Sequence, residues 1–305
     1  MAKLTDEQFS AYLAEAKAKL SAELPIAAEK KINYGYQYTV KLAEAKLTLN
    51  IYNGKKGLNI VYSGDSALAE RAAALLEGRK AKAAAPATFV TDGLWAGSDE
   101  SGKGDFFGSL VVAAVVVDNT TADKLRAAGV KDCKLLTDKK ILELEDIIKA
   151  SVVDYSVLEL KPRVYNLRYE QVAAQGGKLN QLLGYGHVAA LSKVLEKHED
   201  CHSALIDQFT TSMVNIRALK QRFPQCDVRQ QPKAESNLAV AAASVLARAQ
   251  FLHTMAALAA EAGVQELPKG GGAQATACAR ELAAKYGKEA LRNYVKPHFA
   301  NYQRV

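Results

Sequence analysis

The sequence predicts an α/β protein of two units: a small α+β unit, then a larger unit with a mixed sheet and flanking helices. Residues 1–78 hold a helical pattern, three alternating segments and a second helical pattern. Later in the chain, apolar strand-like runs alternate with longer helical patterns. Residues 79–90 combine Lys, Arg, Ala and Pro without an apolar period, which is typical of a linker. We therefore expect domains at 1–78 and 91–305, joined by a linker over 79–90.

The first unit begins with a helix. Thr5 and Gln8 have the spacing of a capping box, and the apolar residues that follow recur at helical spacing. Asp65 or Ser66 caps a second helix that is expected to end near Leu76. Between the two helices, period-two alternation and an Asn-Gly turn signal predict a three-stranded meander over 34–40, 47–51 and 58–62.

The second unit alternates strands and helices, which is the pattern of a mixed α/β sheet. Strands are expected at 110–117, 152–160, 204–208 and 227–231. Helices are expected at 138–150, 180–197, 237–262 and 275–286.

The composition favours a cytoplasmic protein with a polyanionic partner. The net charge of +7 and the pI near 9.0 suggest such a partner, although a lysine-rich enzyme without one has the same charge. The four cysteines lack paired spacing, so we expect reduced thiols. The N-terminus has no signal-peptide core, and the apolar run 238–246 is too short to span a bilayer. We expect a monomer that does not bind membranes.

The segment 97–105, Gly-Ser-Asp-Glu-Ser-Gly-Lys-Gly-Asp, combines two carboxylates with a small-residue loop around one lysine. Carboxylates repel a phosphate unless divalent cations lie between them, so the segment predicts metal-dependent phosphoryl transfer. A phosphate-binding loop would place Ser or Thr after the lysine and then a helix. Here Gly104 follows Lys103, and residues 106–117 are rich in β-branched and aromatic residues that predict a strand. That interpretation is therefore excluded.

Two metal ions acting on a phosphodiester need several acidic ligands from different elements. Candidates are Asp99 and Glu100 at an expected strand end, Asp207 after the apolar run 204–206, and Glu235 before an alanine-rich helix. Taken alone, Glu235 also fits a helix-dipole partner and Asp207 a loop cap. Adjacent acids on a regular strand point to opposite faces, so Asp99 and Glu100 share a site only if the chain bends there. The nearby glycines would permit such a bend.

Five segments of the second unit resemble ribonuclease HIII, a type 2 ribonuclease H, in the order of that family. They are Gly-Ser-Asp-Glu-Ser-Gly-Lys-Gly-Asp-Phe-Phe-Gly at 97–108, Gly-Val-Lys-Asp-Cys-Lys-Leu-Leu-Thr-Asp at 129–138, Leu-Asn-Gln-Leu-Leu-Gly-Tyr-Gly-His at 179–187, Leu-Ile-Asp-Gln-Phe at 205–209, and Lys-Ala-Glu-Ser through Ala-Ser-Val-Leu-Ala-Arg at 233–248. The lysine between Gly102 and Gly104 favours HIII over the related HII, which carries arginine there.

The resemblance implies an RNase H fold for the second unit and a TBP-like substrate-binding domain before it. It implies cleavage of the RNA strand of RNA–DNA hybrids with Mg²⁺ or Mn²⁺. The acidic quartet of the family, which holds the metals and carries the catalysis, corresponds to Asp99, Glu100, Asp207 and Glu235.

Substrate contacts are expected near the acids, because only the 2′-hydroxyl marks RNA chemically against DNA. Lys134 is a candidate phosphate contact, next to Cys133, where the family usually has serine. His187 is expected to have a structural role. The backbone groups that can approach a minor groove belong to Ser101, Gly102, Lys103 and Gly104.

The expected reaction is two-metal hydrolysis that leaves 5′-phosphate and 3′-hydroxyl ends. Alternatives are an HII-like cleavage at single ribonucleotides in DNA and a noncatalytic hybrid-binding protein. A nucleotide-hydrolysing enzyme is disfavoured by Gly104.

Overall fold

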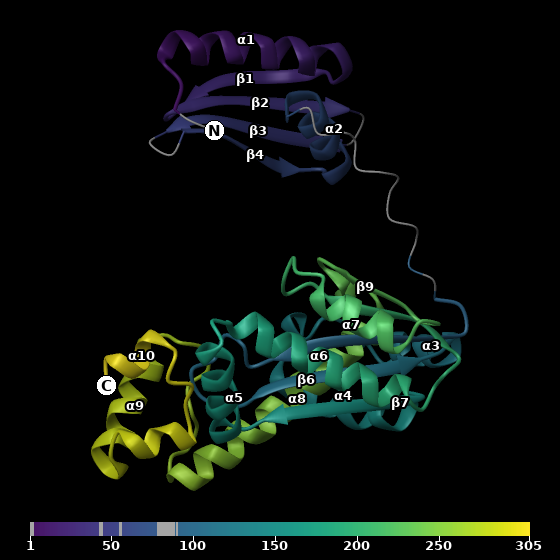
Figure 1. Cartoon of the computed structure of the whole chain (residues 1–305), viewed down its shortest axis with the longest axis vertical. Coiled ribbons are helices and arrows are strands. Elements are labelled where there is room, and N and C mark those ends of the chain that lie inside the picture. Colours follow the sequence, from purple (N-terminus) through teal and green to yellow (C-terminus); the bar gives the residue numbers. More distant parts are fainter. Residues whose placement is uncertain (1–2, 43–44, 55–56, 78–88, 90) are drawn as a thin grey trace. The chain divides into compact units, whose positions relative to one another are not determined.

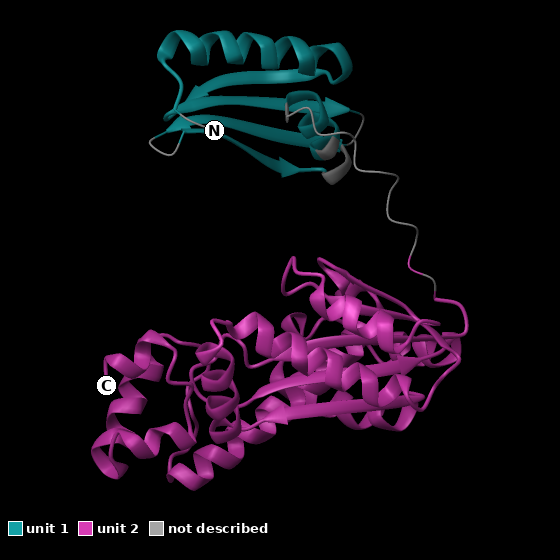
Figure 2. Ribbon diagram, in the orientation of Figure 1, with its two compact units in different colours: residues 1–88 teal, residues 89–305 magenta. Residues whose placement is uncertain are grey.

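The structure is a computed structural model that describes residues 3–42, 45–54, 57–77, 89 and 91–305 (Figure 1). The chain divides into two compact units, residues 1–88 and 89–305 (Figure 2). Apart from residue 89, the expected linker over 79–90 falls outside the described residues, and its boundaries stay a prediction.

The smaller unit is an antiparallel four-stranded sheet with two helices on one face (Figure 1). Its elements are α1 (Asp6–Glu23), β1 (Ile26–Ile32), β2 (Gly35–Leu42), β3 (Ala45–Gly54), β4 (Gly57–Gly64) and α2 (Ser66–Glu77). The Thr5 capping box is present, and the Asp65 carboxylate accepts a hydrogen bond from the Leu68 N–H at 2.9 Å, so both expected helix starts are confirmed. Leu20 of α1 and Ala72 of α2 share one core with the inward side chains of the strands.

The three-stranded meander was wrong by one strand, because β1 precedes the three that alternation predicted. β1 reads Ile-Ala-Ala-Glu-Lys-Lys-Ile, and its interior residues are exposed. It is an edge strand, and charged side chains such as Lys30 and Lys31 on an edge oppose pairing with another chain. The same charges remove the hydrophobic alternation by which a strand is found in sequence.

The larger unit is a mixed five-stranded sheet in the order β7-β6-β5-β8-β9, with helices on both faces (Figure 1). β5 is antiparallel to β6 and parallel to β8, so it is the central strand. The elements are β5 (Leu94–Ser101), β6 (Leu110–Val117), α3 (Asn119–Ala127), α4 (Asp138–Ser151), β7 (Asp154–Leu160), α5 (Pro162–Ala174), α6 (Leu179–Leu195), β8 (Cys201–Asp207), α7 (Val214–Arg222), β9 (Asp227–Gln231), α8 (Leu238–Ala262), α9 (Ala273–Tyr286) and α10 (Ala300–Gln303). The predicted fold class is confirmed, although the short helices α3, α5, α7 and α10 were not anticipated.

Side chains of β6 alternate between the two faces of the larger sheet. On one face, Val111, Ala113 and Val115 belong to the core that also contains residues of α3, α4 and α8. On the other face, the intervening residues 112, 114 and 116 belong to the core that contains residues of α5, α6 and α7. Each helical layer therefore has its own core, and the sheet lies between the two.

Helix α8 crosses the sheet at the carboxylate-bearing strand. Gly97 permits this contact, because a Cβ on it would lie 2.2 Å from the Val240 backbone nitrogen. Among the described residues, α8 is the one helix long and apolar enough in composition to cross a membrane. Of its most apolar part, 72% is buried inside the unit, so the core of this unit accounts for its apolar character.

Candidate active site

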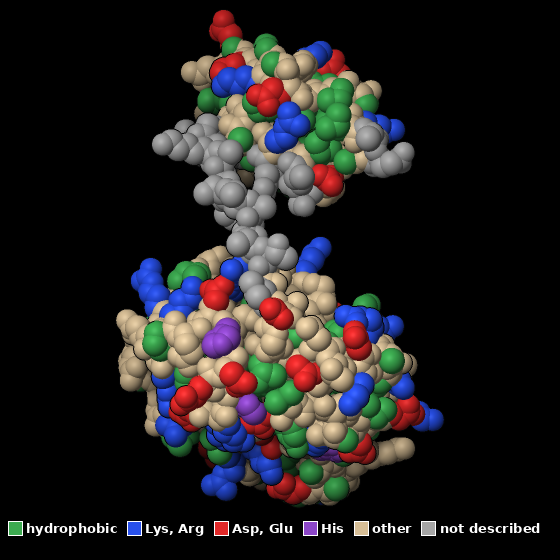
Figure 3. All heavy atoms as spheres, turned by 90° about the vertical axis from the view of Figure 1, so that its right-hand side faces the viewer, with side chains coloured by type: hydrophobic (Ala, Val, Ile, Leu, Met, Phe, Trp, Pro, Cys, Tyr) green, Lys and Arg blue, Asp and Glu red, His purple; other side chains and the backbone are tan. Residues whose placement is uncertain are grey.

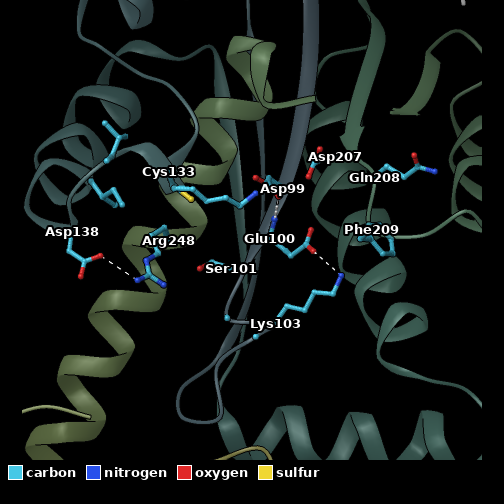
Figure 4. Close-up of a pocket in the computed structure, with 15 residues that line it drawn as sticks. Asp99, Glu100, Ser101, Lys103, Cys133, Asp138, Asp207, Gln208, Phe209 and Arg248 are labelled. Atoms are coloured by element: carbon cyan, nitrogen blue, oxygen red, sulfur yellow. Dashed lines mark hydrogen bonds and ion pairs between the residues drawn. The ribbon is translucent and has the colours of Figure 1, made fainter. Parts of the chain in front are cut away.

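Asp99 and Asp207 lie side by side on adjacent parallel strands. Ser98 of β5 pairs with Ile206 of β8, so the next residue of each strand is an aspartate at the same level of the sheet. Asp99 shares its face with Gly97, which contacts α8, and Asp207 shares its face with Leu205, which packs on Val240 of α8. The two carboxylates therefore occupy one face at one end of the sheet (Figure 4).

Glu100 points to the opposite face of β5. The register is regular through both acids, with Asp99 opposite Ala113 and Glu100 opposite Val112. The chain therefore does not bend at the acids themselves; it turns directly after them at Gly102, one of the glycines expected to permit a bend, where φ is +87°. Both acids nevertheless line one cleft of about 590 Å³, because they stand at the open end of the strand.

Glu100 is held by His187 of α6 and by Lys103. The Glu100 Oε2 atom lies 3.2 Å from His187 Nε2. Its Oε1 atom lies 3.6 Å from Lys103 Nζ (Figure 4). The buried His187 ring also places Nδ1 2.7 Å from the Ser98 hydroxyl and stacks on Phe209 at 4.8 Å. A ring protonated on Nε2 donates to Glu100 and accepts from Ser98, which satisfies both partners. His187 thus positions an acid of the site.

The segment 101–108, here called the approach loop, forms one wall of the cleft. Its lining members include all four residues predicted to approach the substrate: Ser101, Gly102, Lys103 and Gly104. The Asp105 N–H donates to the Gly102 carbonyl at 3.3 Å, which closes a tight turn. A Cβ at Gly102 would lie 2.1 Å from the backbone oxygen of Ser109, so this position requires glycine.

The other wall comes from the segment 133–141 and from α8. Lys134 lines the cleft as predicted, and Asp132 caps its short helical turn by accepting from the Lys134 N–H at 3.0 Å. Arg248 of α8 also lines the cleft and pairs with Asp138 at 3.3 Å. Cys133 lies beside them with its N–H donating to Ser244 Oγ at 3.1 Å. Cationic side chains thus stand on the wall facing the approach loop.

Glu235, the fourth predicted acid, stands next to the cleft without lining it. It lies in the helical turn Ala234–Ser236, half-buried, after Lys233 in the left-handed region with φ of +56°. The Ala234 N–H of this turn donates to Asp207 at 3.0 Å, which fixes the turn against the carboxylate end of β8. The structure therefore brings three of the four acids into the cleft, and the fourth lies in the turn that is hydrogen-bonded to Asp207.

Burial and mutual repulsion govern the charges of the site. Burial first, and then the charge of Glu100, raise the pKa of Asp99 well above its usual range. Burial likewise raises the pKa of Asp207. Burial acts the same way on Glu100, but the His187 hydrogen bond and the charge of Lys103 outweigh it and hold the pKa of Glu100 below its ordinary value. The His187 hydrogen bond and the charge of Lys103 thus outweigh burial at Glu100, whereas the charge of Lys134 does not outweigh burial at the two aspartates.

This donor set fits hard divalent cations. Asp99 is only 8% exposed, and neither it nor Asp207 has an ion-pair partner among the described residues. Neighbouring carboxylates of raised pKa are stabilised by a bound cation with oxygen preference, such as Mg²⁺ or Mn²⁺. Within the part of the chain that the structure describes, no three His, Cys, Asp or Glu side chains converge as a preformed cation site. The fit therefore rests on the Asp99–Asp207 pair.

Surface charge adds little to this local arrangement. On the face of the larger unit in Figure 3, Lys and Arg side chains are interspersed with Asp and Glu. The net charge of +7 is therefore not gathered into one basic field on that face. The cations that line the cleft, Lys103, Lys134 and Arg248, carry the electrostatic argument for a polyanion instead.

Comparison with known proteins agrees with these observations. The family model for ribonuclease HII matches residues 96–302. Ribonuclease HIII of Protochlamydia amoebophila is 38% identical over 203 residues, which cover 67% of this chain and 65% of that protein. Ribonuclease HIII of Bacillus subtilis is 40% identical over 218 residues, covering 68% and 66%. The matches thus span about two thirds of these relatives' own length.

Solved structures resemble the chain over almost its whole length. The crystal structure of Bst-RNase HIII in complex with Mn²⁺ has a TM-score of 0.63 at 28% identity and covers 99% of this chain and 96% of that one. The crystal structure of Aquifex aeolicus RNase H3 has a TM-score of 0.56 at 24% identity, covers 98% and 99%, and supports the fold alone.

The fold, the cleft and the family match define the class: the chain belongs to the type 2 ribonuclease H family, whose members are metal-dependent endoribonucleases. The two relatives compared at 38% and 40% identity are both ribonucleases HIII. Within the class, the chain belongs to the ribonuclease HIII family, as the sequence motifs predicted.

Sequence reasoning missed several residues of the site. His187 was given a structural role, and its contact with Glu100 appears only when α6 packs on β5. Phe209 and Arg248 lie in the segments 205–209 and 233–248 that resemble the family, but no role was predicted for either residue, although both line the cleft. The one local signal was that Arg248, a charged residue, ends an Ala-rich apolar run in α8, which could have marked it as a candidate for the site.

Proposed function

We propose that this protein is an endonuclease that cleaves the RNA strand of RNA–DNA hybrids and leaves 5′-phosphate and 3′-hydroxyl ends. The observation that carries the proposal is the Asp99–Asp207 pair on adjacent strands, facing a cleft lined by Lys134 and the approach loop. Membership of the ribonuclease HIII family supports it. A cytoplasmic location and a monomeric state stay predictions.

Asp99 and Asp207 would hold the divalent cations, with Glu100 and Glu235 as the remaining candidate ligands. When bound, such cations supply a water of lowered pKa and charge stabilisation for the departing oxygen. His187 keeps Glu100 oriented, at 3.2 Å from its carboxylate. The proposal thus assigns the acids to the metals and His187 to their positioning.

Recognition of the hybrid is assigned to the cleft walls. The backbone of Gly102 and Gly104 carries no side chain that would keep a minor groove away, and a close backbone can bond the 2′-hydroxyl that marks RNA. Lys134 and Lys103 attract the phosphates, because each adds a positive charge to the cleft. Burial opposes a charged Lys134, but Asp132 and the site carboxylates raise its pKa, so it stays protonated.

The test is cleavage of an end-labelled RNA strand paired with DNA, beside a DNA duplex that holds one ribonucleotide. Both would be run with Mg²⁺, with Mn²⁺ and with chelator. Cleavage of the continuous hybrid alone, lost with chelator, would support the proposal. Cutting at the single ribonucleotide would favour HII-like specificity, and cleavage of neither duplex would favour a noncatalytic binding protein.

Asp99→Asn separates catalysis from binding. Asn retains the oxygen that accepts the Glu100 N–H at 2.7 Å, so the strand end should keep its geometry. We expect cleavage to be abolished and hybrid binding to be retained. Asp146→Asn is the matched control, because Asp146 is exposed on α4 and does not line the cleft. Turnover by Asp99→Asn preparations free of host nuclease would refute the assignment.

A further inference from the structure

Lys296 is a fully buried lysine far in sequence from the acids. Its side chain has no exposed surface, and its Nζ donates to the carbonyls of Asp105 at 2.8 Å and Phe107 at 3.3 Å. The Nζ atom also lies 5.5 Å from the centre of the Tyr165 ring. Burying a lysine is unfavourable unless its donors are satisfied, so this position has a specific demand for an amine.

Both carbonyl acceptors belong to the approach loop. The chain around Lys296 forms further bonds to that loop: the Phe106 carbonyl accepts from the Lys296 N–H at 2.9 Å, and the Gly108 N–H donates to the Tyr294 carbonyl at 3.0 Å. Phe107 and Val295 form a β-bridge. Residues 294–296 therefore run beside residues 105–108 and provide the surface on which the loop rests.

The supporting segment is itself held by α5. The Asn166 amide donates to the carbonyls of Arg292 at 2.9 Å and Val295 at 3.0 Å. Asn166 adjoins Tyr165, whose ring lies beside the Lys296 amino group. Helix α5 thus fixes the backbone and side chain of the Lys296 segment, and Lys296 fixes the loop.

We propose that Lys296 is a positioning residue for substrate binding: its amino group ties the carbonyls of Asp105 and Phe107 and so sets where the Ser101–Gly104 backbone meets the substrate. The inference rests on the proposed function, in which that backbone approaches the hybrid. Lys296 does not line the cleft and touches no reacting group.

The effect is expected on substrate affinity more than on the chemical step. Asp99 and Glu100 lie on β5, which pairs with β6 as far as Ser101. On its other side, β5 pairs with β8 as far as Ser98. These ladders do not involve Lys296, so the acids keep their positions when the loop is released. A contact made equally in the bound and transition states changes KM without changing kcat.

The experiment compares steady-state cleavage of a continuous RNA–DNA hybrid by full-length wild type, Lys296→Met, Lys296→Gln and Lys285→Met. For Lys296→Met we expect KM to rise about ten-fold or more while kcat changes less than about three-fold. Gln retains an amide donor for the carbonyls, so it should recover part of the loss. Lys285→Met makes the same substitution at an exposed site on α9 and should leave both constants unchanged, which controls for the loss of a lysine as such.

Hydrogen exchange gives a second readout that does not need activity. In Lys296→Gln, amides of residues 102–108 should exchange faster than in wild type, while those of α8 stay unchanged. An unchanged KM in Lys296→Met, or unchanged exchange in the loop, would overturn the inference. If Lys296→Met does not fold, Lys296→Gln decides by both readouts. If wild type cleaves no hybrid, the proposed function fails separately, and exchange in the loop still decides whether Lys296 positions it.

Discussion

Replacing His187 with phenylalanine tests how tightly the site is built into the core. Phenylalanine keeps a flat ring against Phe209, which stacks on His187 at 4.8 Å with an angle of 7° between the rings, but it removes both hydrogen bonds. The buried Ser98 hydroxyl then lacks a partner, which costs about 1–3 kcal/mol. Glu100 loses a hydrogen bond to a charged group, worth about 1.5–3 kcal/mol. Together, these losses should lower the free energy of unfolding by about 2.5–6 kcal/mol.

The assay is unfolding followed by tryptophan fluorescence. Trp95 is the single tryptophan and lies on β5, so the signal reports the larger unit. A loss of this size should lower the midpoint of thermal unfolding by about 5–24 °C for a unit of this length. Adding Ser98→Ala removes the orphaned hydroxyl and should recover about 1–2 kcal/mol. His202→Phe, at an exposed position of β8, is the matched control. A His187→Phe midpoint equal to wild type, or no recovery in the double variant, would refute the reasoning.

Three further predictions concern pH and the loop. Because Asp99 has a raised pKa in the folded state, its stabilising contribution is present below about pH 3.8 and is lost as pH rises. With chelator present at pH 7, Asp99→Asn should therefore unfold at a higher temperature than wild type, and this difference should disappear below about pH 3.8. A lower unfolding midpoint for Asp99→Asn at pH 7 would contradict this. Gly102→Ala should weaken hybrid binding, measured by titration, because φ there is +87°; unchanged affinity would contradict the strain argument. Burial lowers the pKa of Lys296 to about 7, so the folded state releases its proton first as pH rises. Between pH 7 and 9, the free energy of unfolding of wild type, measured in urea, should therefore rise by about 2–3 kcal/mol relative to that of Lys296→Met. The neighbours of Lys296 do not add to this change, because the pKa of Tyr165 is raised and that of His298 is about 4, so neither group titrates in this range. If the free energies of unfolding of wild type and Lys296→Met change in parallel with pH, this prediction is refuted.

Local patterns sufficed wherever the signal was local. The strands at Leu110–Val117 and Asp227–Gln231 have the predicted bounds, because their apolar or alternating runs end at clear turn residues. The helix start at Thr5 followed from its capping box. By contrast, the acids lie inside regular β5 rather than in a bend, since two neighbouring strands impose the ladder. Sequence periodicity cannot show that pairing.

The unpredicted parts of the site depend on contacts between distant segments. Residues 100 and 187 meet because α6 packs on β5, and residues 105 and 296 meet because the segment 294–296 runs beside the approach loop. The sequence around His187 or Lys296 does not distinguish either residue from the histidines and lysines that have no such role. Asp207 could be proposed from sequence because it ends an apolar run, and Asp99 and Glu100 because they adjoin a loop of small residues, whereas the choice of Glu235 depended on the family resemblance. A buried partner such as His187 or Lys296 has no such local mark.

The bridge between Phe107 and Val295 also determines when the site can be completed during synthesis of the chain. The acids of β5 leave the ribosome early, but Lys296, which supports the approach loop, is synthesised 189 residues after Phe107 of that loop. A nascent chain that ends before residue 296 has the carboxylates without a positioned loop, so it should bind a hybrid more weakly than the full chain does. Because such distant pairing also closes slowly, activity should be among the last properties acquired during folding.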